Sequence, residues 1–179
     1  MTSATSPRRP NVVLTGFMGT GKSTVGRILA ERLGYEFIDT DAFIENNHGP
    51  IATIFAEQGE ETFRLLERGA AAMLGGDDGQ VIATGGRMAL DPNNAAALQA
   101  NGNIVCLNAT IDEIYARVTA ATDGPHRPLL SGGDPLGQIA NLLAERADAY
   151  AKFPQVNTSG RTPDEVADAV LVALSLSSN

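Results

Sequence analysis

Short apolar runs alternate with longer segments of helical period along the whole chain. Between the runs, apolar residues recur at helical spacing, and Gly34, Asp91-Pro92 and Thr162-Pro163 are typical of helix ends. Alternating strands and helices indicate a parallel sheet covered by helices on both faces, which is the α/β class. The predicted strands are 11–16, 35–41, 80–86, 103–109 and 155–158, and the longest predicted helices are 51–74, interrupted near Gly59, and 135–152.

No internal repeat or linker divides the chain, so we expect one domain over residues 11–179. Residues 1–10 are polar and contain proline, which predicts a disordered tail. Residues 119–135, TAATDGPHRPLLSGGDP, are rich in Gly, Pro, Asp and Ser. Such a stretch in a compact domain is typical of a functional loop, so we interpret it as a mobile lid; the alternative is a passive loop.

Charge and composition restrict the partners. The net charge of −8 argues against broad binding to nucleic acid or to an anionic membrane. The apolar runs fall well short of the roughly 18 residues that a membrane span needs. The single cysteine, Cys106, lies in an apolar strand and is predicted to be a buried core residue without a disulfide. We expect a monomeric cytoplasmic protein.

The stretch GFMGTGKS at 16–23 matches G-x-x-x-x-G-K-[ST], between a predicted strand and a predicted helix. Its glycines let backbone N–H groups turn toward phosphates, and the helix N-terminus adds a favourable dipole. Lys22 is predicted to reach the β- and γ-phosphates, and the Ser23 hydroxyl to bind Mg²⁺. The residues expected to bind ATP here are Gly19, Thr20, Gly21, Lys22, Ser23 and Thr24.

Two carboxylates narrow the kind of nucleotide enzyme. The guanine-reading sequence N-K-x-D is absent, and Asp39 and Asp41 end the second predicted strand. Their spacing of two places both on one side of that strand, at the sheet edge near the phosphate loop. One carboxylate can hold Mg²⁺ through water, and the other can orient and deprotonate an accepting hydroxyl. This pattern favours a small-molecule kinase.

A pair of glycines after the third predicted strand, Gly85-Gly86, suggests that a ligand approaches the backbone closely. Arg87 follows directly. If its position needed a positive φ, arginine would cost roughly 1 kcal/mol relative to glycine. We expect a shifted backbone with the side chain turned to solvent or to an acidic neighbour; the alternative is a guanidinium that contacts the acceptor.

Several separate segments, in order, resemble shikimate kinases along nearly the whole chain. They are GFMGTGKSTVGRILAERL, FIDTD, GEETFRLLE, VIATGG, RPLL, LLAERADAY and NTSGRTPDEV. The resemblance implies a three-layer P-loop kinase fold of the nucleoside-monophosphate-kinase type, with a five-stranded parallel sheet. It also implies transfer of the ATP γ-phosphate to the 3-hydroxyl of shikimate, with Mg²⁺.

The same resemblance implies roles for residues at the matching positions. Asp41 would bind the substrate hydroxyls and act as base, and Asp39 would help Ser23 to hold Mg²⁺. Guanidinium groups suit a planar carboxylate, and the resemblance gives that part to Arg64 and Arg146. Glu67 could orient Arg64 or form a plain surface pair with it. Further implied contacts are Gly85 and Gly86 to the substrate, most plausibly through the Gly86 N–H, Arg127 to the transferring phosphoryl group, and Arg161 with Pro163 to adenine.

Two positions depart from the family pattern. Arg87 stands where a third glycine is usual, and Ala120 stands where the lid usually begins with an arginine, although Arg117 lies nearby. Two other functions therefore stay open. The chain could be a P-loop kinase for a different small hydroxy acid, or a non-catalytic binding module that resembles a kinase.

Overall fold

A five-stranded parallel sheet organises the chain in the computed structural model, which describes residues 9–120 and 134–177. The strand order is β2-β3-β1-β4-β5, so β1 lies in the centre and the chain reverses its winding direction there. This confirms the predicted α/β class and the parallel sheet. The strands are β1 Asn11–Gly16, β2 Glu36–Asp39, β3 Gln80–Ala83, β4 Gly102–Asn108 and β5 Gln155–Asn157.

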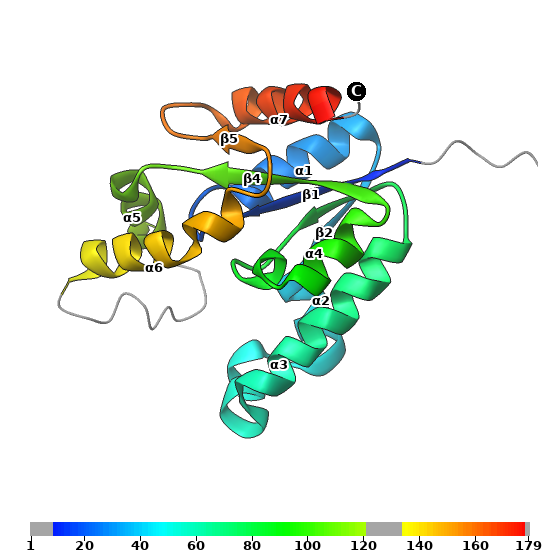
Figure 1. Cartoon of the computed structure of the whole chain (residues 1–179), viewed down its shortest axis with the longest axis vertical. Coiled ribbons are helices and arrows are strands. Elements are labelled where there is room, and N and C mark those ends of the chain that lie inside the picture. Colours follow the sequence, from blue (N-terminus) through cyan, green and yellow to red (C-terminus); the bar gives the residue numbers. More distant parts are fainter. Residues whose placement is uncertain (1–8, 121–133, 178–179) are drawn as a thin grey trace, which may run out of the picture.

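Helices cover both faces of the sheet and form the outer two of three layers (Figure 1). Helices α1 (Lys22–Leu33) and α7 (Pro163–Ser177) pack against each other on one face, and α3 (Ile51–Gly76) and α4 (Pro92–Gln99) pack on the other. The remaining elements are α2 Thr40–His48, the short 3-10 helix η1 Met88–Leu90, α5 Ile111–Ala120 and α6 Pro135–Tyr150.

The central strand shows why the sheet is apolar on both sides. All six residues of β1 are buried, and alternate side chains point to opposite faces. Val13 joins the core beneath α3 and α4, whereas Val12 and Leu14 join the core beneath α1 and α7. A third cluster around Phe17 packs between α5 and α6. The C-terminal end of β1, where the phosphate-binding loop begins, is therefore held from three directions.

Several predicted helix ends are confirmed. Gly34 takes a left-handed conformation (φ 61°) after α1, and its N–H donates to the carbonyls of Ala30 and Glu31. The Asp91 side chain accepts from the Asn93 N–H at the start of α4. At the start of α5 the Thr110 hydroxyl accepts from the Glu113 N–H, while the Glu113 carboxylate binds the Gly160 N–H and Arg117.

Two predicted strands end earlier than expected. The second strand ends at Asp39 rather than at residue 41, because a helix, α2, begins at Thr40 with Asp39 as its N-cap. The strand predicted for 80–86 likewise ends at Ala83. Of the tail predicted for 1–10, the structure describes Arg9 and Pro10, and Arg9 donates to the carbonyls of Leu33 and Gly34. Residues 1–8 and most of the predicted lid, 121–133, lie outside the described residues.

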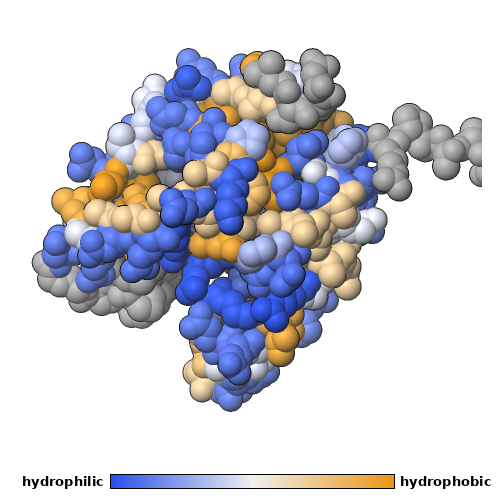
Figure 2. Space-filling model, viewed as in Figure 1, coloured by the Kyte–Doolittle hydropathy of each residue, from blue (hydrophilic) through white to orange (hydrophobic). Residues whose placement is uncertain are grey.

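Helices α2 and α3 project away from the sheet (Figure 1). Gly59 interrupts α3 with a left-handed backbone (φ 83°, ψ 169°), as the sequence predicted near that residue. In the space-filling view, hydrophilic residues gather over this projection and along the indentation that separates it from the rest of the molecule (Figure 2). The projection therefore forms one wall of an open, polar region at the C-terminal ends of the strands.

Candidate active site

The phosphate-binding loop connects β1 to α1. The Lys22 ammonium group donates to the carbonyl oxygens of Gly16 and Phe17, both at 2.9 Å, so the lysine folds over its own loop. The Thr20 hydroxyl donates to the Phe17 carbonyl at 2.8 Å and is buried. These bonds hold the loop in a curved form, with its predicted ATP-binding residues at the N-terminus of α1, where a helix attracts anions.

Ser23 and Asp39 meet at the base of this loop. The Ser23 hydroxyl donates to Asp39 Oδ2 at 2.9 Å. The other carboxylate oxygen, Oδ1, accepts from the N–H groups of Asp41 and Ala42 at 3.1 and 3.3 Å. From the sequence we expected the side chains of Asp39 and Asp41 on one side of a strand. In the structure Asp39 is instead the N-cap of α2, and its carboxylate binds the Asp41 N–H. Asp39 is thereby fixed with an oxygen directed at the phosphate-binding loop.

Asp41 lies against the turn that follows β3. A methyl group placed on Gly85 would be 2.5 Å from Asp41 Oδ1, so only glycine allows this approach. The Gly85 N–H donates to the Thr40 hydroxyl at 2.9 Å, which ties the turn to the start of α2. Burial raises the pKa of Asp41 to about 6; Asp39 and Glu67 add to the rise, and Lys22 opposes it. A carboxylate with such a pKa suits a general base near neutral pH.

The two arginines predicted to hold a carboxylate come from different helices. Arg64 on α3 donates to Glu67 Oε2 at 2.7 Å and to Glu60 Oε1 at 2.7 Å. Arg146 on α6 lies near Gly86, and its guanidinium carbon is 5.2 Å from the centre of the Phe17 ring. The predicted pairing of Arg64 with Glu67 is confirmed, and it is not a plain surface pair because the Glu67 side chain is only 4% exposed.

Gly86 differs from its neighbour Gly85. Its N–H makes no hydrogen bond to another described residue, whereas its carbonyl accepts from the Tyr150 hydroxyl at 2.6 Å. Tyr150 belongs to the same helix as Arg146, so this bond joins the turn to α6. Of the two glycines, Gly86 is therefore the one whose backbone N–H remains available for a ligand.

Most of these groups, but neither Arg64 nor Arg146, line one open cavity of about 480 Å³ at the C-terminal edge of β1, β2 and β3. Its wall combines the phosphate-binding loop on one side with Asp39, Asp41 and the Gly85-Gly86 turn on the other. The sequence-predicted residues that line it are Gly19, Gly21, Lys22, Ser23, Thr24, Asp39, Asp41, Gly85 and Gly86. Arg127, predicted to act on the transferring group, lies outside the described residues.

A smaller cavity of about 260 Å³ adjoins the phosphate-binding loop. Arg161 and Pro163 line it, at the position that the sequence suggested for adenine, together with Thr20 and Thr24. Arg117, which the sequence analysis noted without giving it a role, lines both cavities. Its guanidinium donates to the Thr158 hydroxyl at 2.9 Å and to the Gly19 carbonyl at 3.3 Å.

Ala120, where the family usually has its first lid arginine, is the exposed last residue of α5. Arg117 lies one helical turn earlier and faces the phosphate-binding loop. The only signal in the sequence was its position just before the Gly- and Pro-rich segment. Its contacts with Gly19 and Thr158, which lie far away in the chain, appear only in the folded structure.

Comparison with known proteins agrees with this geometry. The family model described as shikimate kinase matches residues 18–175. A shikimate kinase of Symbiobacterium thermophilum is 44% identical over 168 residues, which are 92% of this chain and 95% of that protein. One from Geobacter sulfurreducens is 44% identical over 158 residues, which are 87% and 86% of the two chains.

A solved structure has the same fold. The shikimate kinase from Acinetobacter baumannii in complex with shikimate superposes with a TM-score of 0.83 and 33% sequence identity. The match covers 96% of this chain and 95% of that one.

Within residues 9–120 and 134–177, each helix is too short or too polar to cross a membrane.

Proposed function

Because the chain belongs to the shikimate kinase family, we infer that it phosphorylates shikimate with ATP, as a step of the shikimate pathway. One observation in the structure carries the chemistry. Asp41, with its pKa raised to about 6, lies in the same cavity as Lys22 and Ser23 of the phosphate-binding loop. A base is therefore placed beside a phosphate site, as transfer to a hydroxyl requires.

The phosphate-binding loop holds ATP in this proposal. Backbone N–H groups of Gly19, Thr20 and Gly21 surround the phosphates, and Lys22 exchanges its bonds to Gly16 and Phe17 for phosphate oxygens. The adenine occupies the smaller cavity between Arg117 and the loop of Arg161 and Pro163. Arg117 then supplies the lid contact that Ala120 cannot.

Mg²⁺ fits the oxygen pair formed by Ser23 and Asp39. The two side-chain oxygens face each other at 2.9 Å at the base of the loop, and a hydroxyl with one carboxylate suits an ion that keeps most of its waters. When bound, Mg²⁺ neutralises charge on the β- and γ-phosphates. Asp39 is prepared for this part because its other oxygen is already fixed by the cap of α2.

Asp41 accepts the proton of the 3-hydroxyl of shikimate. The hydroxyl oxygen forms a bond to the γ-phosphorus while the bond from that phosphorus to the β,γ-bridging oxygen breaks, which yields shikimate 3-phosphate and ADP. Arg64 and Arg146 hold the shikimate carboxylate, and the Gly86 N–H offers a further contact. Arg127 stabilises the transferring charge.

The alternatives from the sequence are less well supported. A non-catalytic module has no need for a half-buried base with a raised pKa beside a phosphate loop. A different hydroxy acid would need a different acceptor wall, yet the resemblance assigns Asp41, Arg64, Gly86 and Arg146 to shikimate. A solved structure with the same fold is a complex with shikimate. Action as a cytoplasmic monomer stays a prediction.

The test measures ADP release in the presence of Mg²⁺, with shikimate and without it. Other hydroxylated carboxylic acids then replace shikimate one at a time. We expect shikimate-dependent turnover and the highest kcat/KM for shikimate. Asp41→Asn should lower kcat by about 10³-fold, because the amide cannot accept the proton, while ATP affinity stays within about twofold. Absence of shikimate-dependent ADP release in the unaltered protein would overturn the proposed function.

A further inference from the structure

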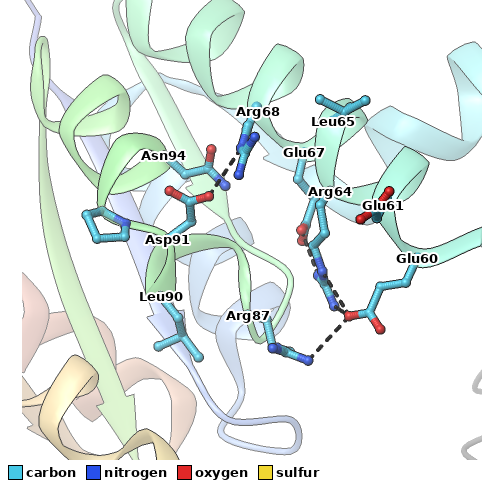
Figure 3. Close-up of a pocket in the computed structure, with 11 residues that line it drawn as sticks. Glu60, Glu61, Arg64, Leu65, Glu67, Arg68, Arg87, Leu90, Asp91 and Asn94 are labelled. Atoms are coloured by element: carbon cyan, nitrogen blue, oxygen red, sulfur yellow. Dashed lines mark hydrogen bonds and ion pairs between the residues drawn. The ribbon is translucent and has the colours of Figure 1, made fainter.

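Another cavity, of about 710 Å³, lies between α3 and the turn that carries Arg87 (Figure 3). It borders the acceptor side of the active site, because Arg64 and Glu67 line it and Gly86 precedes Arg87 in the turn. Its wall is charged but not predominantly positive. Three guanidinium groups face four carboxylates, and these are Arg64, Arg68, Arg87, Glu60, Glu61, Glu67 and Asp91. The arginines of this wall are therefore paired with carboxylates of the same wall and do not form a general anion-binding site.

The Arg64 guanidinium already binds two protein carboxylates. Its Nη1 donates to Glu67 Oε2, while its Nε and Nη2 both donate to Glu60 Oε1 at 3.2 and 2.7 Å. These bonds use three of its five N–H groups, and Glu60 occupies the edge formed by Nε and Nη2. A fork that binds a carboxylate with two parallel bonds needs two free N–H groups on one edge, so this edge of Arg64 can hold a substrate carboxylate only after Glu60 has moved.

Glu60 is the glutamate that can move. The Glu67 side chain is 4% exposed and belongs to the continuous part of α3, so removing its partner would leave a buried carboxylate unpaired. The Glu60 side chain is 55% exposed and follows Gly59, where the helix is interrupted. Open space surrounds Gly59, since a methyl group placed there would meet no atom within 4 Å.

Arg87 offers Glu60 a second partner. Its Nη1 lies 3.4 Å from Glu60 Oε1, the same oxygen that Arg64 binds (Figure 3). The Arg87 backbone is unstrained, with φ −114° and ψ −10°, so arginine costs nothing at this position of the turn. The expectation of an acidic neighbour is thereby confirmed. The distance is longer than the 2.7 Å bond from Arg64, which places Glu60 mainly with Arg64 and only weakly with Arg87.

We propose that Arg87 is a positioning residue that takes Glu60 from Arg64 when the acceptor carboxylate arrives. This rests on the proposed function, because it assumes a carboxylated acceptor bound by Arg64. Arg87 lowers the cost of the exchange, since Glu60 passes from one guanidinium to another without becoming unpaired. It acts through Glu60 and does not itself contact the acceptor.

A double-mutant cycle tests the exchange. The KM for shikimate, the KM for ATP and kcat are measured by ADP release for the unaltered protein, Arg87→Ala, Glu60→Gln and the double variant. We expect Arg87→Ala to raise the KM for shikimate about fivefold, while kcat and the KM for ATP change by less than about twofold. In the Glu60→Gln background, Arg87→Ala should change the KM for shikimate by less than about twofold, because no competing carboxylate remains.

Two variants control for simple loss of charge. Arg68 lines the same cavity and is equally exposed, but it pairs with Asp91 at 3.2 Å instead of with Glu60. Arg68→Ala should therefore leave the KM for shikimate within about twofold of its original value. Arg87→Lys retains the positive charge, and its KM for shikimate should lie within about twofold of the value for the unaltered protein.

The outcomes separate this inference from the proposed function. An equal effect of Arg87→Ala in both backgrounds would mean a direct contact with the acceptor and would overturn the exchange. An unchanged KM in Arg87→Ala would reduce the contact to a surface ion pair and would also overturn it. In both cases the unaltered protein still turns over shikimate, so the proposed function stands; its failure would appear as no shikimate-dependent ADP release at all.

Discussion

The nucleotide side and the acceptor side of the cavity are built in different ways. The phosphate-binding part of the nucleotide side comes from one continuous segment, residues 16–23, and its lysine is held by carbonyl oxygens of the same loop. The acceptor side combines residues from α2, α3, α6 and the turn after β3. Arg64 and Arg87 on this side are held by side-chain ion pairs that differ in burial and length.

Because of this difference, amino-acid substitutions are expected to affect the two sides in different ways. A site made of backbone N–H groups depends on the path of the chain, so most side chains around it can vary without removing a donor. A site made of ion pairs depends on which counter-ions surround each arginine. An added arginine such as Arg87 can be accommodated on the acceptor side because Glu60 is present to pair with it.

The largest effect in this comparison is expected from removing the Lys22 side chain on the nucleotide side. Lys22→Ala removes the charge that compensates the phosphates and should lower kcat by about 10²- to 10³-fold in the ADP-release assay. The chain has only two lysines, so Lys152→Ala is a matched control; Lys152 is exposed and lies just beyond α6. Retention of a tenth of the original kcat in Lys22→Ala would contradict the prediction.

A smaller effect is expected from altering the path of the chain on the acceptor side. The methyl group of Gly85→Ala would lie 2.5 Å from Asp41 Oδ1 and should displace the carboxylate, because the backbone there is tied to Thr40. We expect kcat/KM for shikimate to fall about 10- to 100-fold while the affinity for ATP, measured by calorimetry, is retained.

Gly69→Ala is the control for Gly85→Ala. Gly69 lies on α3, and a methyl group there meets no atom within 4 Å, so activity should not change and stability should rise slightly. Loss of ATP affinity in Gly85→Ala would contradict the separation of the two sides.

The mildest change is one of pH, and it sharpens the comparison without altering a residue. The pKa of Asp41 is raised to about 6, mainly by burial, and the reaction requires its ionised form. The value of kcat/KM for shikimate should therefore fall as the pH drops through about 6, by about tenfold per pH unit below it. ATP affinity in the absence of shikimate should not follow this profile, and a parallel loss would assign the titration to the nucleotide side.

The same raised pKa of Asp41 lowers the free energy of unfolding at neutral pH. Folding favours the protonated Asp41, so the cost is absent below the unfolded pKa of 3.8, grows as the pH rises toward 6 and is complete above it. A half-buried base is thus maintained at some expense of stability, in keeping with a functional rather than a structural role.

Local patterns gave correct predictions for several short stretches that contain all the interacting groups. The phosphate loop, the caps at Gly34 and Asp91 and the break at Gly59 each depend on residues within a few positions of one another. Helix α2 was missed because FIDTD has the apolar content of a strand, and the side chain that starts the helix, Asp39, also has a part in the site. The pattern alone could not choose between these two readings.

The sequence by itself determined the alternating α/β order, the phosphate loop and the family, because each is encoded in contiguous or ordered motifs. Only the tertiary structure decided the contacts between distant segments. It placed Asp41 against Gly85, Arg117 between Gly19 and Thr158, and Glu60 between Arg64 and Arg87. Burial and long-range ion pairing arise from groups that the fold brings together, so the pKa of Asp41 and the pairing of Glu60 with Arg87 follow from the fold and not from any local sequence.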